Sequence, residues 1–116
     1  MDTTGRYKYL TVVEGEGLGL FAARVREALG DNLTSLKLFG SKARGDFDAE
    51  SDIDILVLVK SRDWDLHYRV CNIANDIALE YGINISPVII AESEYDLNRE
   101  HGTAFYESVE REGILV

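Results

Sequence analysis

The chain has 116 residues and a mass of 13.0 kDa, a length that suits one domain with a single core. Hydrophobic residues make up 46% and charged residues 28%, which excludes a disordered chain. The formal net charge of −9 argues against a broad nucleic-acid-binding surface, because phosphate binding needs Lys and Arg. Cys71 is the single cysteine, so neither an internal disulfide nor a Cys-based zinc site is expected.

No part of the sequence predicts a signal peptide or a membrane span. The longest apolar run, residues 55–59, is far shorter than the roughly 20 residues that cross a bilayer. We therefore expect a cytoplasmic protein with no membrane partner. Residues 1–116 form a single predicted domain, in which residues 1–17 are an N-terminal strand and loop extension.

The first elements are a weak strand and a helix. Residues 7–13 predict the strand, and a glycine-rich segment follows it. Apolar residues from Leu18 to Leu29 then recur at spacings of three and four, which predicts one buried helix face ending at Gly30. Residues 36–39 predict a short strand that stops at Gly40. A polar loop over residues 41–51 comes next, with a helical turn at its start.

The strand predicted over residues 52–59 is the most informative. Its alternation places two sets of side chains on opposite faces. One face is apolar throughout, whereas the other is charged at its beginning and apolar at its end. That pattern is typical of a strand with a polar site at one rim of a sheet. The two sets are Ile53, Ile55, Val57 and Val59 on one face, and Asp52, Asp54, Leu56 and Leu58 on the other.

The second half predicts a helix, a strand and a helical tail. Asp63 is a plausible N-cap for a long helix that ends at Gly82. Residues 83–90 predict a third strand, and Pro87 within it favours an edge position or a bulge. Residues 94–112 predict helix with a break near Gly102, and the last four residues predict a helix stop and a short edge strand.

These elements constrain the topology of the sheet. The end of the first sheet strand meets the start of the second only if the two run antiparallel. The third strand can bring its start to the same rim only if it runs parallel to the second, after a crossover helix. The sequence therefore predicts an α/β (α+β) fold, with a small mixed sheet and helices packed on one face.

Asp52 and Asp54 are the first candidate site residues. Asp is disfavoured in strands, and two on one face lie about 6.6 Å apart. Their charges repel by roughly 2.5 kcal/mol at an effective dielectric constant near 20, so folding gives no reason for the pair. A divalent cation such as Mg²⁺ removes the repulsion. The alternative is a solvated strand end that carries two incidental acids.

The loop before that strand adds a candidate phosphate site. Gly40 lets backbone N–H groups approach a phosphate, Ser41 adds a hydroxyl, and Lys42 and Arg44 could supply positive charge. Read alone, the Gly-Ser pair is a tight turn with a helix cap. Together with the two aspartates, it predicts a site for a metal-bound nucleoside triphosphate.

Residues 39–45, FGSKARG, and 51–57, SDIDILV, together resemble the signature of the minimal nucleotidyltransferases of the DNA polymerase beta superfamily. The likeness extends from about Leu18 to the end of the chain. It implies magnesium-dependent transfer of a nucleotidyl group, AMP from ATP, to an acceptor hydroxyl. By position, Asp52 and Asp54 would be the catalytic magnesium ligands, and Gly40 and Ser41 would hold phosphates. Arg44 matches a motif arginine that is structural or phosphate-binding.

The resemblance also implies a partner. Many such small proteins act as antitoxins to a helical HEPN protein, some by adenylylating it. The chain has no helical domain of its own to hold an acceptor, so we expect either such a partner or a homodimer. A nucleic-acid polymerase module is disfavoured by the net charge.

One departure from the family pattern concerns the third carboxylate. The family carries it on the strand after the crossover helix, where this chain has Asn84 and Ser86. Asn84 is either a weak metal ligand or a plain polar residue. Either a nearby acid such as Glu80 or Glu92 substitutes, or the chain binds nucleotide and turns over slowly or not at all. The second hypothesis is therefore a nucleotide-binding antitoxin or assembly module without efficient chemistry.

Overall fold

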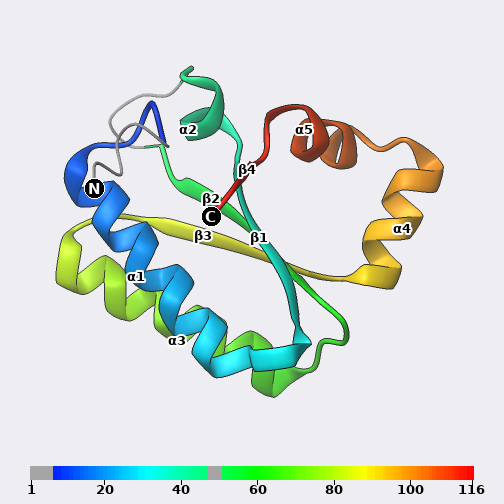
Figure 1. The fold of residues 1–116 in the computed structure, drawn as a ribbon, viewed down its shortest axis with the longest axis horizontal. Helices are drawn as coiled ribbons and strands as arrows, with labels where there is room; N and C mark the ends of the chain where they lie inside the picture. Colours follow the sequence, from blue (N-terminus) through cyan, green and yellow to red (C-terminus); the bar gives the residue numbers. More distant parts are fainter. Residues whose placement is uncertain (1–6, 47–50) are drawn as a thin grey trace.

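The computed structural model describes residues 7–46 and 51–116. Its centre is a four-stranded sheet in the order β3-β2-β1-β4 (Figure 1). β1 runs antiparallel to β2 and β4, whereas β2 runs parallel to β3, so the predicted mixed sheet is confirmed. The strands are β1 (Leu33–Phe39), β2 (Ile53–Val59), β3 (Ile85–Ala91) and β4 (Ile114–Leu115).

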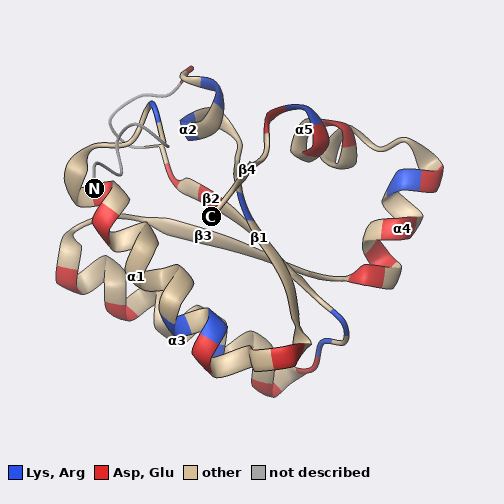
Figure 2. Cartoon of the chain, viewed as in Figure 1, with Lys and Arg blue, Asp and Glu red and all other residues tan. Residues whose placement is uncertain are grey.

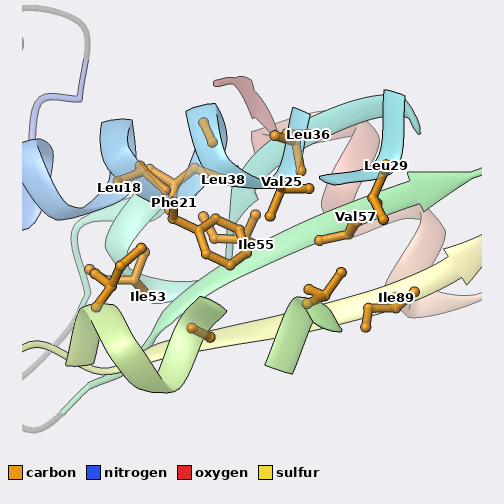
Figure 3. Close-up of a cluster of buried hydrophobic side chains, with 14 of the residues drawn as sticks. Leu18, Phe21, Val25, Leu29, Leu36, Leu38, Ile53, Ile55, Val57 and Ile89 are labelled. Atoms are coloured by element: carbon orange, nitrogen blue, oxygen red, sulfur yellow. The ribbon is translucent and has the colours of Figure 1, made fainter. Parts of the chain in front are cut away.

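The two long helices lie side by side on one face of the sheet (Figure 1). They are α1 (Val12–Leu29), which a single 3₁₀ turn, η2 (Gly30–Asn32), joins to β1, and α3 (Trp64–Tyr81), the predicted crossover helix. Apolar side chains of both helices meet the strands in the main core, where Phe21 of α1 and Ile55 of β2 are fully buried (Figure 3).

The opposite face carries a second, smaller core. Two C-terminal helices, α4 (Glu92–His101) and α5 (Ala104–Glu112), pack there against the far half of β2. Leu56 of β2, Tyr95 of α4 and Val109 of α5 form its buried centre. The prediction of helices on one face therefore holds for α1 and α3, and the C-terminal pair adds a partial cover on the other face.

The strand predicted over residues 7–13 is wrong, because α1 begins at Val12. Thr11 and Glu14 form a reciprocal capping box, in which each side chain accepts a hydrogen bond from the other's backbone N–H. Gly17 is buried inside the helix, where a Cβ atom would lie 2.3 Å from Cδ1 of Ile83. The glycines thus permit close packing rather than forming a loop. Residues 1–6 lie outside the described residues.

β1 begins at Leu33, earlier than the strand predicted over residues 36–39, whereas the later boundaries hold closely. Asp63 caps α3 through a hydrogen bond to the Leu66 N–H, and Gly82 ends the helix with a left-handed conformation. Pro87 lies in β3, which is an edge strand. The tail breaks at Gly102, and β4 is the predicted short edge strand. None of the helices in residues 7–46 and 51–116 has the length and apolar content needed to traverse a lipid bilayer.

Candidate active site

Three strand ends meet at one rim of the sheet, as the sequence predicted. Asp54 is the second residue of β2 and lies between Phe39, the last residue of β1, and Ser86 near the start of β3. Its face is the one that carries Leu56, away from α1 and α3. Asp52 precedes β2 and is exposed. Figure 2 shows acidic colour at the start of β2, close to the basic residues of the short helix α2 (Ser41–Arg44).

The Asp54 carboxylate lies directly against Gly40. A Cβ atom added to Gly40 would be 2.3 Å from Oδ2 of Asp54, a separation that no real side chain tolerates. Gly40 also has φ +81° and ψ −159°, a conformation that favours glycine. Gly40 therefore allows the backbone conformation of the turn and leaves space for the Asp54 carboxylate. The central expectation, that the acid faces the glycine–serine turn, is met for Asp54.

The pKa of Asp54 is raised above its ordinary value. Partial burial is the main cause, the negative charge of Asp52 adds to it, and the Arg44 guanidinium opposes it. The effect of Asp52 on the pKa shows that the two carboxylates interact electrostatically. An isolated negative charge is therefore disfavoured at this rim, and a cation bound there would be favoured.

Lys42 is directed away from the exposed face of the turn. Its side chain is only 6% exposed, and its ammonium lies 2.8 Å from Oε2 of Glu14 in α1. Burial opposes ionisation of Glu14, but hydrogen bonds from Lys42 and Thr11 outweigh it and lower the pKa of Glu14. The structure therefore places Lys42 in a buried ion pair, which argues for a structural role over phosphate binding.

Arg44 is also paired. Its Nε donates to Asp46 at 3.0 Å, and its Nη1 donates to both carboxylate oxygens of Glu112 at 3.1 and 3.2 Å. Hydrogen bonds to Asp46 and Glu112 raise the pKa of Arg44. Glu112 belongs to α5, which the sequence did not connect with this loop. Both cations that the sequence assigned to phosphate thus already hold carboxylates.

Asn84 and Ser86 lie at the start of the strand on which the family pattern carries its third carboxylate. Ser86 is the register partner of Asp54, and exposed Asn84 precedes β3 on the same side by alternation. Glu80 pairs with Arg24 of α1 at 3.8 Å, so it belongs to the helical face. Glu92 follows Ala91, whose register partner is Val59, about 16 Å along the sheet from Asp54. Substitution by Glu80 or Glu92 is therefore wrong.

The donor atoms at this rim suit a hard divalent cation. Two carboxylates, the Asn84 amide oxygen and the Ser86 hydroxyl offer oxygen ligands of the kind that Mg²⁺ accepts. Within the part of the chain that the structure describes, no cluster of three or more His, Cys, Asp or Glu residues could hold a metal.

A glycine–serine turn set against strand carboxylates, in a mixed sheet of this topology, is the architecture of a nucleotidyltransferase. A family model of the nucleotidyltransferase domain matches residues 21–111. The chain belongs to this family, and the resemblance to minimal nucleotidyltransferases is confirmed. It is an enzyme of the nucleotidyltransferase class.

Two proteins of Methanocaldococcus jannaschii, both named as candidate protein adenylyltransferases, are similar in sequence. One is 37% identical over 97 residues, which cover 83% of this chain and 91% of the relative. The other is 33% identical over 103 residues, which cover 89% and 97%. This chain therefore spans nearly the whole length of both relatives.

Two solved structures are similar in fold. A candidate minimal nucleotidyltransferase superposes with a TM-score of 0.51 at 26% identity, covering 86% of this chain and 95% of that chain. A chain in the crystal structure of a toxin–antitoxin with AMP-PNP gives a TM-score of 0.54 at 22% identity, with coverages of 82% and 68%. The second likeness shows a shared fold alone.

Sequence reasoning missed Glu14 and Glu112 as partners of the motif cations. For Glu14 a signal was present, because Thr-x-x-Glu at residues 11–14 is a capping box. That motif would have moved the helix start and placed Glu14 in its first turn. For Glu112 no local signal exists, since its contact with Arg44 spans 68 residues.

Proposed function

We propose that this chain transfers AMP from magnesium-bound ATP to a hydroxyl group of a protein. The observation that carries the proposal is the Asp54 carboxylate lying against the Gly40 backbone at the open rim of the sheet. Two further findings support it. The relatives from Methanocaldococcus jannaschii are named as candidate protein adenylyltransferases, and a fold neighbour was crystallised with AMP-PNP.

Each site residue has a distinct role in this proposal. Asp52 and Asp54 hold Mg²⁺, with Asn84 as an additional oxygen ligand, and Gly40 and Ser41 bind the outer phosphates. When bound, the ion neutralises phosphate charge and orients the α-phosphorus. Because Lys42 and Arg44 are already paired with carboxylates, a divalent cation is needed to balance the triphosphate. The acceptor oxygen displaces pyrophosphate, and its proton passes to solvent.

Slow turnover is part of the proposal. Ser86 lies beside Asp54 on β3, and a serine hydroxyl is a far weaker base than a carboxylate. Loss of a general base typically costs about 10²–10⁴-fold in rate. We therefore expect the chain to bind Mg·ATP readily and to transfer AMP over many minutes. Ser86→Asp should accelerate transfer if the missing acid is the cause.

The acceptor belongs to a separate protein in this proposal, either a helical HEPN-type toxin or a second copy of the chain. A fold neighbour comes from a toxin–antitoxin, which supports the first choice.

The test uses radiolabelled ATP with magnesium, first with the chain alone and then with a helical protein encoded by a neighbouring gene as candidate acceptor. We expect label from the α-phosphate to appear on a protein band, and none from the γ-phosphate, because AMP rather than phosphate moves. Asp54→Asn should abolish the signal, whereas Glu100→Gln, an exposed change on α4, should preserve it. Transfer of γ-label, or α-label that persists in Asp54→Asn, would contradict the proposal.

The second candidate is a nucleotide-binding antitoxin or assembly module without chemistry. The specific observation in its favour is Ser86, an alcohol, as the register partner of Asp54. Calorimetric titration with ATP, with and without magnesium, separates the two functions. Magnesium-dependent binding with no AMP transfer to any tested partner, even in Ser86→Asp, supports the module. Measured transfer excludes it.

A further inference from the structure

Helix α2 carries the glycine–serine turn but is too short to hold its own position. It has four residues, and three backbone hydrogen bonds close it: Ala43 and Arg44 donate to the Gly40 carbonyl, and Gly45 donates to the Ser41 carbonyl. Helices of this length have little stability of their own. The orientation of the turn must therefore come from contacts with the rest of the molecule.

The first such contact ties α2 to the start of α1. Lys42 and Glu14 form an ion pair with side chains only 6% and 14% exposed, so water screens it little. Glu14 is itself fixed, because its other carboxylate oxygen, Oε1, accepts the Thr11 N–H at 3.0 Å. One carboxylate therefore joins the helix cap of α1 to the lysine that follows Ser41.

The second contact ties α2 to the end of α5. The Glu112 side chain is 8% exposed, accepts both bonds from Arg44, and also accepts a hydrogen bond from the Ser108 hydroxyl. One nitrogen of Arg44, Nη1, thus donates to both oxygens of Glu112, and the Ser108 hydroxyl holds that carboxylate in place. In Figure 2, α2 carries Lys and Arg colour and the end of α5 carries Asp and Glu colour, and the Arg44–Glu112 pair joins the two helices.

We propose that Glu14 and Glu112 are positioning residues for nucleotide transfer. They hold Lys42 and Arg44 from opposite sides, so that the turn stays seated against Asp54. The two motif cations then serve the placement of the turn and do not contact the phosphates. This inference rests on the proposed function for its role in transfer, whereas the anchoring itself is a property of the free chain.

We call Glu14 and Glu112 the two anchors. Neutralising them distinguishes positioning of the turn from phosphate binding, because the two roles predict opposite changes in nucleotide affinity. Glu14→Gln and Glu112→Gln each remove the negative charge that ties a motif cation to α1 or α5, while Arg44 keeps its bonds to Asp46. Gln at position 14 keeps the capping box of α1. If Lys42 and Arg44 bind phosphate, loss of these partners tightens nucleotide binding. If the anchors position the turn, binding weakens. We expect a loss of about tenfold or more per anchor, as for loss of a charged hydrogen bond.

Calorimetry with magnesium and an ATP analogue that has a methylene between the α- and β-phosphorus atoms measures this affinity. Glu80→Gln is the matched control, because it breaks the Arg24–Glu80 pair between α1 and α3, away from the turn. Its affinity should stay within about twofold of the unaltered chain. Tighter or unchanged binding in Glu112→Gln and Glu14→Gln overturns the proposal.

Exchanging the partners tests the second anchor without leaving a buried charge alone. Arg44→Glu should weaken binding, and the double variant with Arg44→Glu and Glu112→Arg should recover part of it, because glutamate at position 44 still faces Asp46. A direct phosphate contact predicts no recovery, since glutamate at position 44 repels a triphosphate. A double variant that binds no better than Arg44→Glu therefore overturns the proposal.

Amide hydrogen exchange supplies a readout that needs no nucleotide. The N–H groups of Ala43, Arg44 and Gly45 close α2 and should exchange faster in both Glu→Gln variants, while α3 amides keep their protection. Unaltered exchange at these three amides overturns the anchoring. If the unaltered chain binds no Mg·ATP, the proposed function fails and the role in transfer fails with it, but faster exchange still establishes the anchors.

Discussion

The two faces of β2 differ in what covers them. Ile53, Ile55 and Val57 face α1 and α3 along the full strand, and all three are buried. On the other face the strand begins with Asp54, half-buried, and the cover of α4 and α5 reaches only its later half, from Leu56 on. The comparison teaches that one strand serves the core on one side and keeps a carboxylate accessible on the other.

The largest expected effect is a loss of stability when the core on the covered face of β2 is disrupted. Phe21→Ala removes a fully buried ring from the centre of the main core. We expect a loss of about 3–5 kcal/mol in the free energy of unfolding, a large part of the roughly 5–15 kcal/mol typical of a domain. Urea denaturation followed by circular dichroism measures it. A loss below about 1 kcal/mol would show that this face is not the principal core.

A smaller effect is expected at the open face. Gly40→Ala places a Cβ atom against the Asp54 carboxylate and forces a residue other than glycine to a φ of +81°. We expect about 1–3 kcal/mol of destabilisation and loss of Mg·ATP binding.

Gly19→Ala is the matched control for that change. No atom lies within 4 Å of the added Cβ, and the residue is exposed within α1. Thermal unfolding should show a gain of up to about 1 kcal/mol in Gly19→Ala, with nucleotide binding unchanged. Retained binding in Gly40→Ala would contradict the close approach of the turn to Asp54.

The smallest expected effect is a pH dependence of the stability that arises from Asp54 on the open face. Folding raises the pKa of Asp54, mainly by burial, so ionisation costs stability in the folded chain. This cost is absent below the ordinary aspartate pKa and grows as pH rises through that value to the raised one. Asp54→Asn removes it, so the variant should gain melting temperature relative to the unaltered chain as pH increases from 4 to 7.

Thermal scans at several pH values measure this difference, with Glu100→Gln as the exposed control. The variant should lose nucleotide binding while it keeps or gains stability. A variant less stable than the unaltered chain at pH 7 would mean that the Asp54 carboxylate stabilises the fold, contrary to its placement on the open face.

Local patterns were sufficient for most of the sheet. Period-two alternation in β2 assigned both faces correctly, and the turn glycines Gly40, Gly82 and Gly102 marked the ends of β1, α3 and α4. Local patterns failed at the start of α1, because the apolar residues 12 and 13 fit a strand pattern as well. The capping interaction between Thr11 and Glu14 and the packing of Gly17 against Ile83 outweigh the low helix propensity of glycine there.

Some residues of the site could likewise be predicted from local sequence, and others could not. Asp54 and Gly40 were predictable in combination: an acid inside a strand conflicts with local preference, and a glycine–serine turn at the end of the preceding strand supplies a matching phosphate site. Lys42 and Arg44 were not predictable, because a cation in a loop is compatible with any anion. Lys42 meets a carboxylate 28 residues earlier, and Arg44 meets one 68 residues later in addition to its near neighbour Asp46.

The amino-acid order alone determined where the strands and α3 lie, which face of β2 is apolar, and that Asp54 would face a glycine–serine turn. These features follow from periodicities of two and 3.6 residues and from turn chemistry. Only the tertiary structure decided that Ser86 stands beside Asp54 and that both motif cations bind carboxylates of α1 and α5. Such pairings depend on strand register and on long-range packing, and neither leaves a signal in neighbouring residues.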